Sequence, residues 1–269
     1  MSLFSPGNRH TKYLNRQGDL LSLGRYFNFR HEFFRQLGFE LAVWTNSATD
    51  ASNIASGFDP YFALLADSAN GPLQAITANG LELTTSDTAD GDDAIIQPHS
   101  VAAVSGLRTS GVLSLTQGFD IEVTWALKTG ASIADLTLFA GAGENIKSAI
   151  GGTSGDDQAG FVKRETDTNW QFVIVKANSA TYFDTHIPVA ASTSYILSAK
   201  FRATDGKVEC RIATGDDSQL AHVGITSAAY EFASATNLYP FAFIENTSGA
   251  GQATIATFRG VDVFVDRTS

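Results

Sequence analysis

Two carboxylates on one predicted strand are the residues whose spacing comes nearest to known chemistry. Asp120 and Glu122 lie two positions apart, and Ile121, Val123 and Trp125 alternate with them. Residues at i and i+2 share one face of a strand, and a retaining glycoside hydrolase needs two carboxylates about 5–5.5 Å apart. On a strand this requirement is met by acids at i, i+2 and about i+5. No third acid follows here, and Trp125 occupies the i+5 position. We therefore predict two acids on the wet face of a strand, and a protein that is not an enzyme.

The histidines and glycines give no better catalytic pattern. The five histidines are scattered without ligand spacing, and none pairs with a plausible serine or cysteine nucleophile: His10, His31, His99, His186 and His222. No glycine-rich loop joins a strand to a helix, so no nucleotide site is indicated. We predict surface or loop histidines, no catalytic residues and no cofactor.

An acidic loop is the weak candidate for a metal site. Asp87, Asp90, Asp92 and Asp93 lie close together, and Ca²⁺ takes six to eight oxygen ligands. The loop lacks the glutamate of the helical calcium-binding pattern, and acidic residues in tight turns usually cap the turn. Asp156-Asp157 and Asp216-Asp217 are similar. We predict no bound metal, with Asp90, Asp92 and Asp93 as weak candidates.

The three tryptophans divide into two groups by phase. Trp125 and Trp170 fall on the same face as their aliphatic neighbours, which favours the core. Trp44 alternates out of phase with Leu41 and Val43 and is the better candidate for an interface or a ligand such as a glycan.

The elements that would position these groups are strands. Tyr195 to Phe201 alternates in polarity, Val208 to Ile212 does the same, and Asp205-Gly206 lies between them. Such alternation on both sides of an Asp-Gly pair is a strong hairpin signal and favours a type I′ turn. Roughly a dozen such segments over residues 38–269 predict one all-β domain. We expect an antiparallel two-sheet jelly-roll sandwich with one wet face per sheet.

Cysteine content and hydropathy indicate the compartment in which the chain is synthesised. Cys210, the single cysteine, alternates inward on its predicted strand and cannot form an intramolecular disulfide. Met1 to Gln17 contains no apolar signal region, and no run of about 18 apolar residues exists. We expect synthesis in a reducing cytoplasm, no signal peptide and no membrane partner.

The order of several segments resembles the concanavalin-like jelly rolls of tailed-bacteriophage virion proteins. The segments that carry the resemblance lie within about residues 75–266: Asn79–Thr85, Ala89–Asp93, Ile95–Gln97, Phe119–Val123, Gly160-Phe161, Asn169–Val173, Asp184-Thr185, Val189–Tyr195, Asp205-Gly206 and Gly260–Val265. The resemblance is a pattern of strands and turns with no catalytic signature. It implies a virion surface role, as a head decoration (cement) protein or, less often, a fibre module.

Charge separates an N-terminal arm, residues 1–37, from the rest. Residues 1–36 hold six Lys+Arg and two acids, a net of +4; the whole chain is −10, so residues 37–269 carry −14. The acidic body disfavours nucleic acid as a partner. Within the arm, Tyr26, Phe29, Phe33 and Leu37 recur at helical spacing, which indicates a short amphipathic helix over 25–37. A helix or extended strand packed on the body's own sheet is the alternative.

Two functions agree with these observations. The first is a capsid decoration protein, which we expect to be a homotrimer. Its arm would bind the major capsid protein of a phage head through basic and aromatic residues: Arg9, Lys12, Arg16, Arg25, Arg30, Arg35, Phe27, Phe29, Phe33 and Phe34. The second is a carbohydrate-binding module of a fibre or cell-surface protein, which would need exposed aromatics on a concave sheet.

Overall fold

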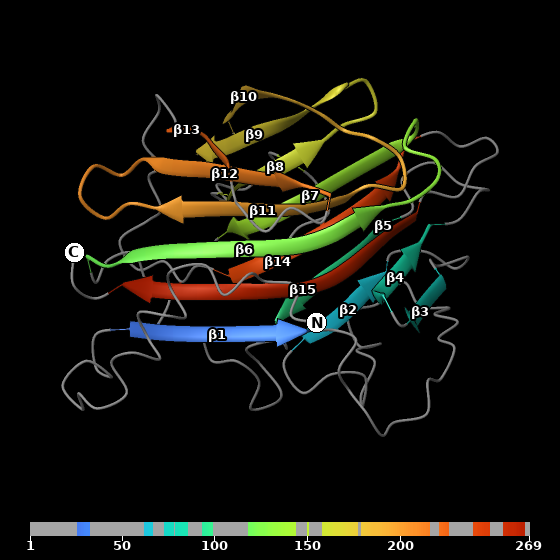
Figure 1. Cartoon of the computed structure of the whole chain (residues 1–269), viewed down its shortest axis with the longest axis horizontal. Coiled ribbons are helices and arrows are strands. Elements are labelled where there is room, and N and C mark those ends of the chain that lie inside the picture. Colours follow the sequence, from blue (N-terminus) through green and yellow to red (C-terminus); the bar gives the residue numbers. More distant parts are fainter. Residues whose placement is uncertain are drawn as a thin grey trace.

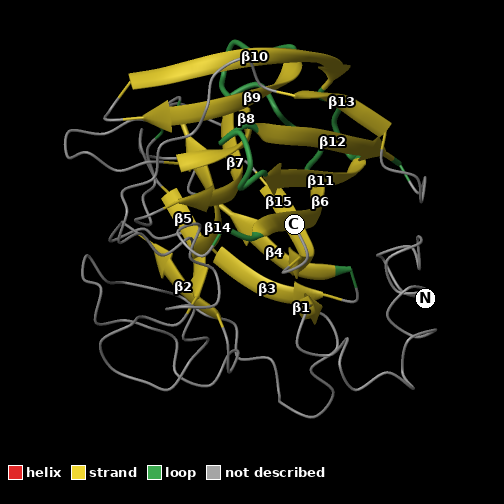
Figure 2. Cartoon of the chain, turned by 90° about the vertical axis from the view of Figure 1, so that its left-hand side faces the viewer, coloured by secondary structure: helices red, strands yellow, loops and turns green. Residues whose placement is uncertain are grey.

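A computed structural model of the chain describes residues 26–32, 62–66, 73–77, 79–85, 93–98, 118–143, 150, 158–176, 179–215, 221–225, 239–247 and 255–266. These residues form fifteen strands in two antiparallel sheets, stacked as the two layers seen in Figure 2. The predicted all-β, two-sheet jelly-roll sandwich is confirmed. Within the described residues, no helix is long and apolar enough to cross a membrane.

Sheet A has eight strands and faces the viewer in Figure 1. Its path is β13-β12-β11-β6-β15-β4-β3, and β1 also pairs with β15. The strands are β1 Tyr26–Glu32, β3 Leu73–Thr77, β4 Gly80–Thr84, β6 Asp120–Thr129, β11 Ser194–Phe201, β12 Val208–Thr214, β13 Ala221–Ile225 and β15 Ile255–Asp266.

Sheet B has seven strands in the order β10-β9-β8-β7-β14-β5-β2. The strands are β2 Phe62–Ala66, β5 Asp93–Pro98, β7 Leu136–Gly143, β8 Gln158–Lys163, β9 Asn169–Lys176, β10 Ser179–Pro188 and β14 Tyr239–Asn246.

The core lies between the sheets and is built from alternate residues of the central strands: β4, β6, β11, β12 and β15 of sheet A, and β5, β7, β8, β9 and β14 of sheet B. Trp125 and Trp170 are both fully buried there, as their phase predicts. Trp125 Nε1 on sheet A donates to the Gly141 carbonyl on sheet B at 3.1 Å. Trp170 and Tyr195 meet edge to face, with ring centroids 5.2 Å apart. Large rings in well-defined contacts fix how the sheets face each other, because each buries much apolar area.

The wet face expected on sheet B is wrong. A second apolar layer covers the outer side of this sheet, and its members are all buried: Ile95, Phe139, Val162, Val173, Val175, Phe241 and Phe243. All eight residues of β7 are buried. Strands buried on both faces read as continuous apolar runs rather than as alternation, and Leu136–Gly143 and Tyr239–Asn246 have that character.

The hairpin between β11 and β12 is confirmed, but its turn is not type I′. Gly206 has φ +65°, whereas among the described non-glycine residues only His186 and Ser192 have positive φ, so Asp205 does not. Arg202 N donates to Lys207 O at 2.9 Å, and Gly206 N donates to Arg202 O at 3.1 Å. A four-residue loop with one left-handed glycine therefore replaces the two-residue turn, which needs positive φ twice.

The helix predicted over residues 25–37 is wrong where the structure describes it. Tyr26–Glu32 is strand β1, paired antiparallel with β15 along Gly260–Asp266. The segment carries both periodicities, and the pairing partner decides between them. A short amphipathic helix is marginal alone, whereas the edge of β15 supplies seven residues of backbone partners. The arm therefore contributes a strand to the body's own sheet.

Candidate functional site

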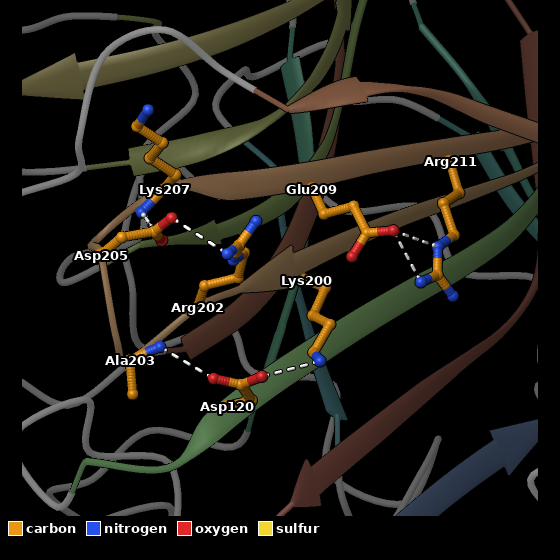
Figure 3. A network of polar contacts seen from close by, with 8 residues as sticks. All are labelled: Asp120, Lys200, Arg202, Ala203, Asp205, Lys207, Glu209 and Arg211. Carbon is orange, nitrogen blue, oxygen red and sulfur yellow. Dashed lines mark hydrogen bonds and ion pairs between the residues drawn. The ribbon is translucent and has the colours of Figure 1, made fainter. Parts of the chain in front are cut away.

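Polar side chains gather on the outer face of sheet A. We call them the A-face network: Asp120, Glu122 and Thr124 from β6, Ser198 and Lys200 from β11, Arg202 and Asp205 from the hairpin loop, and Glu209 and Arg211 from β12. The strand register places them side by side, since Glu122 is the partner of Lys200 and Thr124 of Ser198. Figure 3 shows much of this network.

Asp120 joins β6 to the end of β11. Its Oδ2 lies 2.7 Å from Lys200 Nζ, and its Oδ1 accepts a hydrogen bond from Ala203 N at 2.8 Å (Figure 3). The side chain is 12% exposed. A carboxylate with one cation and one backbone donor is well satisfied in this position. Asp120 thereby holds the start of the β11–β12 loop against β6.

Glu122 lies deeper and is bound by hydroxyl groups. Ser198 Oγ donates to Glu122 Oε1, and Thr124 Oγ1 donates to Ser198 Oγ at 3.0 Å. Glu122 is 4% exposed and Ser198 is fully buried. The expectation that both acids lie on a wet face is therefore wrong. Hydroxyl donors replace part of the hydrogen bonding that water would have given to these buried groups.

The outer ion pairs of the network each join two residues of the same strand or loop. Arg211 donates to Glu209 Oε1 from Nε at 3.1 Å and from Nη2 at 2.7 Å. Arg202 Nη2 lies 3.1 Å from Asp205 Oδ2 (Figure 3). These groups are about a third exposed or less, so water screens the pairs and each contributes on the order of 1 kcal/mol or less. The network serves to order the sheet face, and its carboxylates are engaged by protein donors.

A second cluster lies at the β8–β9 hairpin end of sheet B and includes more exposed groups. We call it the hairpin cluster: Arg164, Asp167, Asn169, Tyr182, Asp184 and His186. Arg164 binds Asp167 through Nε at 2.8 Å and Nη2 at 2.9 Å, and its guanidinium carbon lies 4.0 Å from the Tyr182 ring centre. The hydrogen bond with Asp167 is the main cause that raises the pKa of Arg164. The arginine is thus fixed over the aromatic ring.

Asp184 is held in one orientation at the surface. It accepts hydrogen bonds from His186 N at 2.7 Å and from Asn169 Nδ2 at 3.1 Å, and His186 Nδ1 lies 3.5 Å away. The backbone bond from His186 is the largest cause that lowers the pKa of Asp184. His186 has φ +57° and lies where the β9–β10 register shifts between Asp184 and Pro188. A bulge of this kind redirects side chains near a sheet edge.

Lys163 is an unusual buried cation next to this cluster. It is 2% exposed, and its Nζ donates to the carbonyls of Arg164 at 2.8 Å and Glu165 at 3.1 Å. Burial lowers the pKa of Lys163, and the charges of Asp167 and Glu165 oppose that effect. Two carbonyl acceptors partly replace the lost hydration.

Most residues predicted as a partner site lie outside the described part of the chain. These are Arg9, Lys12, Arg16, Arg25, Phe33, Phe34 and Arg35, together with Trp44 and the metal candidates Asp90 and Asp92. Phe27, Phe29 and Arg30 belong to β1, and Asp93 begins β5. Of the described residues, no group of three or more His, Cys, Asp or Glu side chains could hold a metal ion.

The hairpin cluster was missed by sequence reasoning. Its residues come from two strands, β9 and β10, and from the turn between β8 and β9. Only the pairing of β9 with β10 brings them together. The one local signal was Arg164 and Asp167 three residues apart across a turn. Nothing in the sequence placed Tyr182 beside Arg164, or Asp184 beside Asn169.

No known protein family matches the chain, and neither does any curated protein. Among solved structures, a protein of unknown function, SO2946 from Shewanella oneidensis MR-1, has a TM-score of 0.59 at 17% identity, over 94% of this chain and 96% of its own. Lectin II from Ulex europaeus gives 0.49 at 11% identity, over 89% and 98%. The CBM2 module of the evolved Dit of Lactobacillus casei BL23 phage J-1 gives 0.44 at 10%, over 91% and 98%. The first likeness shows a shared fold alone, and the two lower scores carry nothing further.

Proposed function

We propose that this chain is a non-enzymatic structural protein of a tailed-phage virion, in which the sandwich is a rigid body and the segment before β1 binds the head shell. The major capsid protein is the expected partner. In this virion surface role, residues 1–25 make the contact with the head shell. These hold four Lys+Arg and one Asp, a net of +3.

One observation carries the proposal: β1 fastens the basic segment to the edge of an acidic body. Arg25 immediately precedes Tyr26, whose register partner is Asp266 on β15. The first 25 residues are therefore joined to the sandwich at a defined point, and their net charge is opposite to that of the body. Charge of this kind speeds and orients docking on an acidic partner surface.

The contacts of Asp120 and Glu122 support the non-enzymatic part of the proposal. Asp120 is engaged by Lys200 and a backbone N–H, and Glu122 by a fully buried serine. A glycosidase pair must flank a sugar and leave one carboxylate open to it. These two acids instead hold neighbouring strands together.

Co-sedimentation with purified phage heads tests the proposal. Lys12→Gln/Arg16→Gln should lose most of the bound protein, and the remaining binding should depend less on salt. Lys176→Gln/Lys207→Gln removes the same charge from the body and should bind as the parent does. Equal binding by both double variants would show that the segment is not the contact. Absence of the parent protein from pelleted heads would overturn the head role itself.

Glycan binding is a second candidate, favoured by the hairpin cluster. Asp184 is exposed and preoriented by Asn169 and His186, and half-buried Gln171 is its register partner on β9. Carboxylate and amide groups arranged this way can accept from and donate to sugar hydroxyls. A glycan array should then give signals that Asp184→Asn and Gln171→Ala both remove, while Glu209→Gln on the opposite sheet retains them. An array that stays blank with the parent protein would exclude this candidate.

A further inference from the structure

Strand β15 has one continuous neighbour and one divided neighbour. β6 runs along nearly its whole length from Ala256 to Asp266. On the other side, β4 pairs with Ile255–Phe258, and β1 pairs with Gly260–Asp266. Figure 1 shows β1 beside the half of β15 that β4 does not reach. We call this half of the edge, Gly260–Asp266, the β15 slot.

A continuous backbone register joins the slot and its occupant. Seven consecutive pairs join them, from Tyr26 with Asp266 to Glu32 with Gly260. The slot strand also carries Val261, Val263 and Val265, all fully buried. An empty slot would leave a row of unpaired backbone groups beside a core strand, which is costly and prone to pair with another chain.

The chain between β1 and the next described strand is long enough to serve two molecules. Twenty-nine residues separate Glu32 from Phe62, which begins β2 in the other sheet. A chain of that length spans up to about 100 Å when extended. Its length therefore does not restrict β1 to the slot of its own chain.

Charge does not distinguish one slot from another. The basic arm, at +4, faces a body of −14 whether that body is its own or a second copy's. The attraction and the backbone pairing are the same in both cases. What differs is the effective concentration, which for two sites joined by a linker of about thirty residues is on the order of millimolar.

We propose that β1 is exchangeable, and that copies of this chain held side by side link by placing β1 of one copy in the β15 slot of the next. Exchange is minor in dilute solution and dominant where the local concentration of neighbouring copies exceeds that of the connection. The inference concerns copies of this chain only and does not depend on the proposed capsid partner. On a lattice it would give neighbouring copies a direct link.

Cysteine pairing in the full chain tests the exchange. Asn28 and Phe264 are register partners, and opposite residues of an antiparallel pair lie within the Cα separation a disulfide needs. Differently tagged Asn28→Cys and Phe264→Cys chains are unfolded together, refolded at high protein concentration and oxidised. Native Cys210 is buried and its thiol pKa is raised, mainly by burial, so it does not compete.

Exchange predicts a disulfide-linked pair of the two tags whose yield rises with concentration. That yield should exceed by about tenfold the yield when Thr204→Cys, in the exposed β11–β12 loop, replaces Asn28→Cys. The Asn28→Cys/Phe264→Cys chain at low concentration should instead close within itself. If it closes while the mixture gives no more linked pair than the Thr204 control, β1 never leaves its own chain and the proposal fails. If the double variant does not close either, the register is wrong and the proposal also fails.

Discussion

The two sheets differ in the side chains that their central strands direct away from the shared core. These are Glu122, Thr124 and Ser198 on sheet A, and Phe139, Phe241 and Phe243 on sheet B. Both sets are buried below a tenth of their surface, yet one is satisfied by hydrogen bonds and the other by ring packing. Sheet A has apolar side chains on its inner face and hydrogen-bonded polar side chains on its outer face. Sheet B instead carries buried apolar side chains on both of its faces. The contrast predicts that truncating a side chain on the outer face of sheet B destabilises the fold more than truncating one on the outer face of sheet A.

The largest effect is expected from truncating a ring on the outer side of sheet B. Phe139 lies with ring centroids 4.8 Å from Phe241 and 5.6 Å from Phe243. Phe139→Ala should cost about 3–5 kcal/mol of unfolding free energy, because a fully buried ring leaves a cavity. Urea denaturation measures it. Phe264→Ala removes the same ring from a half-buried site on sheet A and should cost less than half as much; equal losses would end the distinction between the faces.

A smaller effect is expected from adding a single methyl group. At Gly160 a new Cβ would lie 2.7 Å from the Ala140 carbonyl oxygen and 2.8 Å from the Phe139 ring. Because the backbone cannot yield easily, Gly160→Ala should cost about 1–3 kcal/mol. Gly224→Ala on β13 of sheet A meets nothing within 4 Å and serves as the matched control. Thermal melts in which both variants fall together would show that sheet B is not tightly packed at this point.

Removing the central hydroxyl of the A-face network should cost about 1–2 kcal/mol. Ser198→Ala takes a donor from Glu122 and an acceptor from Thr124, both of which are nearly buried. Glu122→Gln in the same background should recover part of the loss, since a neutral amide tolerates burial better than a carboxylate. A double-mutant cycle reads this coupling. Strictly additive losses would mean that the two side chains do not interact.

The smallest effect concerns pH and the buried lysine on sheet B. Burial lowers the pKa of Lys163, so the unfolded chain binds its proton more tightly than the folded chain does. Stability from this group therefore rises with pH between the lowered folded value and the ordinary 10.5. Lys163→Met should be relatively most stable at neutral pH, and its advantage should shrink toward pH 10.5. Lys128→Met, half-buried on sheet A, is the control; a pH-independent difference between Lys163→Met and the parent would contradict the assignment.

Strand existence and the central tryptophans followed from local pattern. Alternation around Asp205-Gly206 predicted a hairpin, and phase placed Trp125 and Trp170 in the core, because period two and turn chemistry act within a few residues. The loop type was missed, since positive φ is needed at Gly206 but not at Asp205. The sequence also placed Cys210 inward, and it is buried.

Tertiary structure alone decided the remaining features. Tyr26–Glu32 is a strand because the β15 edge, more than 220 residues away in the chain, offers it backbone partners. Asp120 and Glu122 share a face as their spacing required, yet whether that face was wet depended on Ser198 and Lys200 arriving from β11. The second apolar layer on the outer side of sheet B and the hairpin cluster likewise depend on which strands pair. Periodicity fixes which residues share a face of a strand, but contacts between distant strands determine what covers that face.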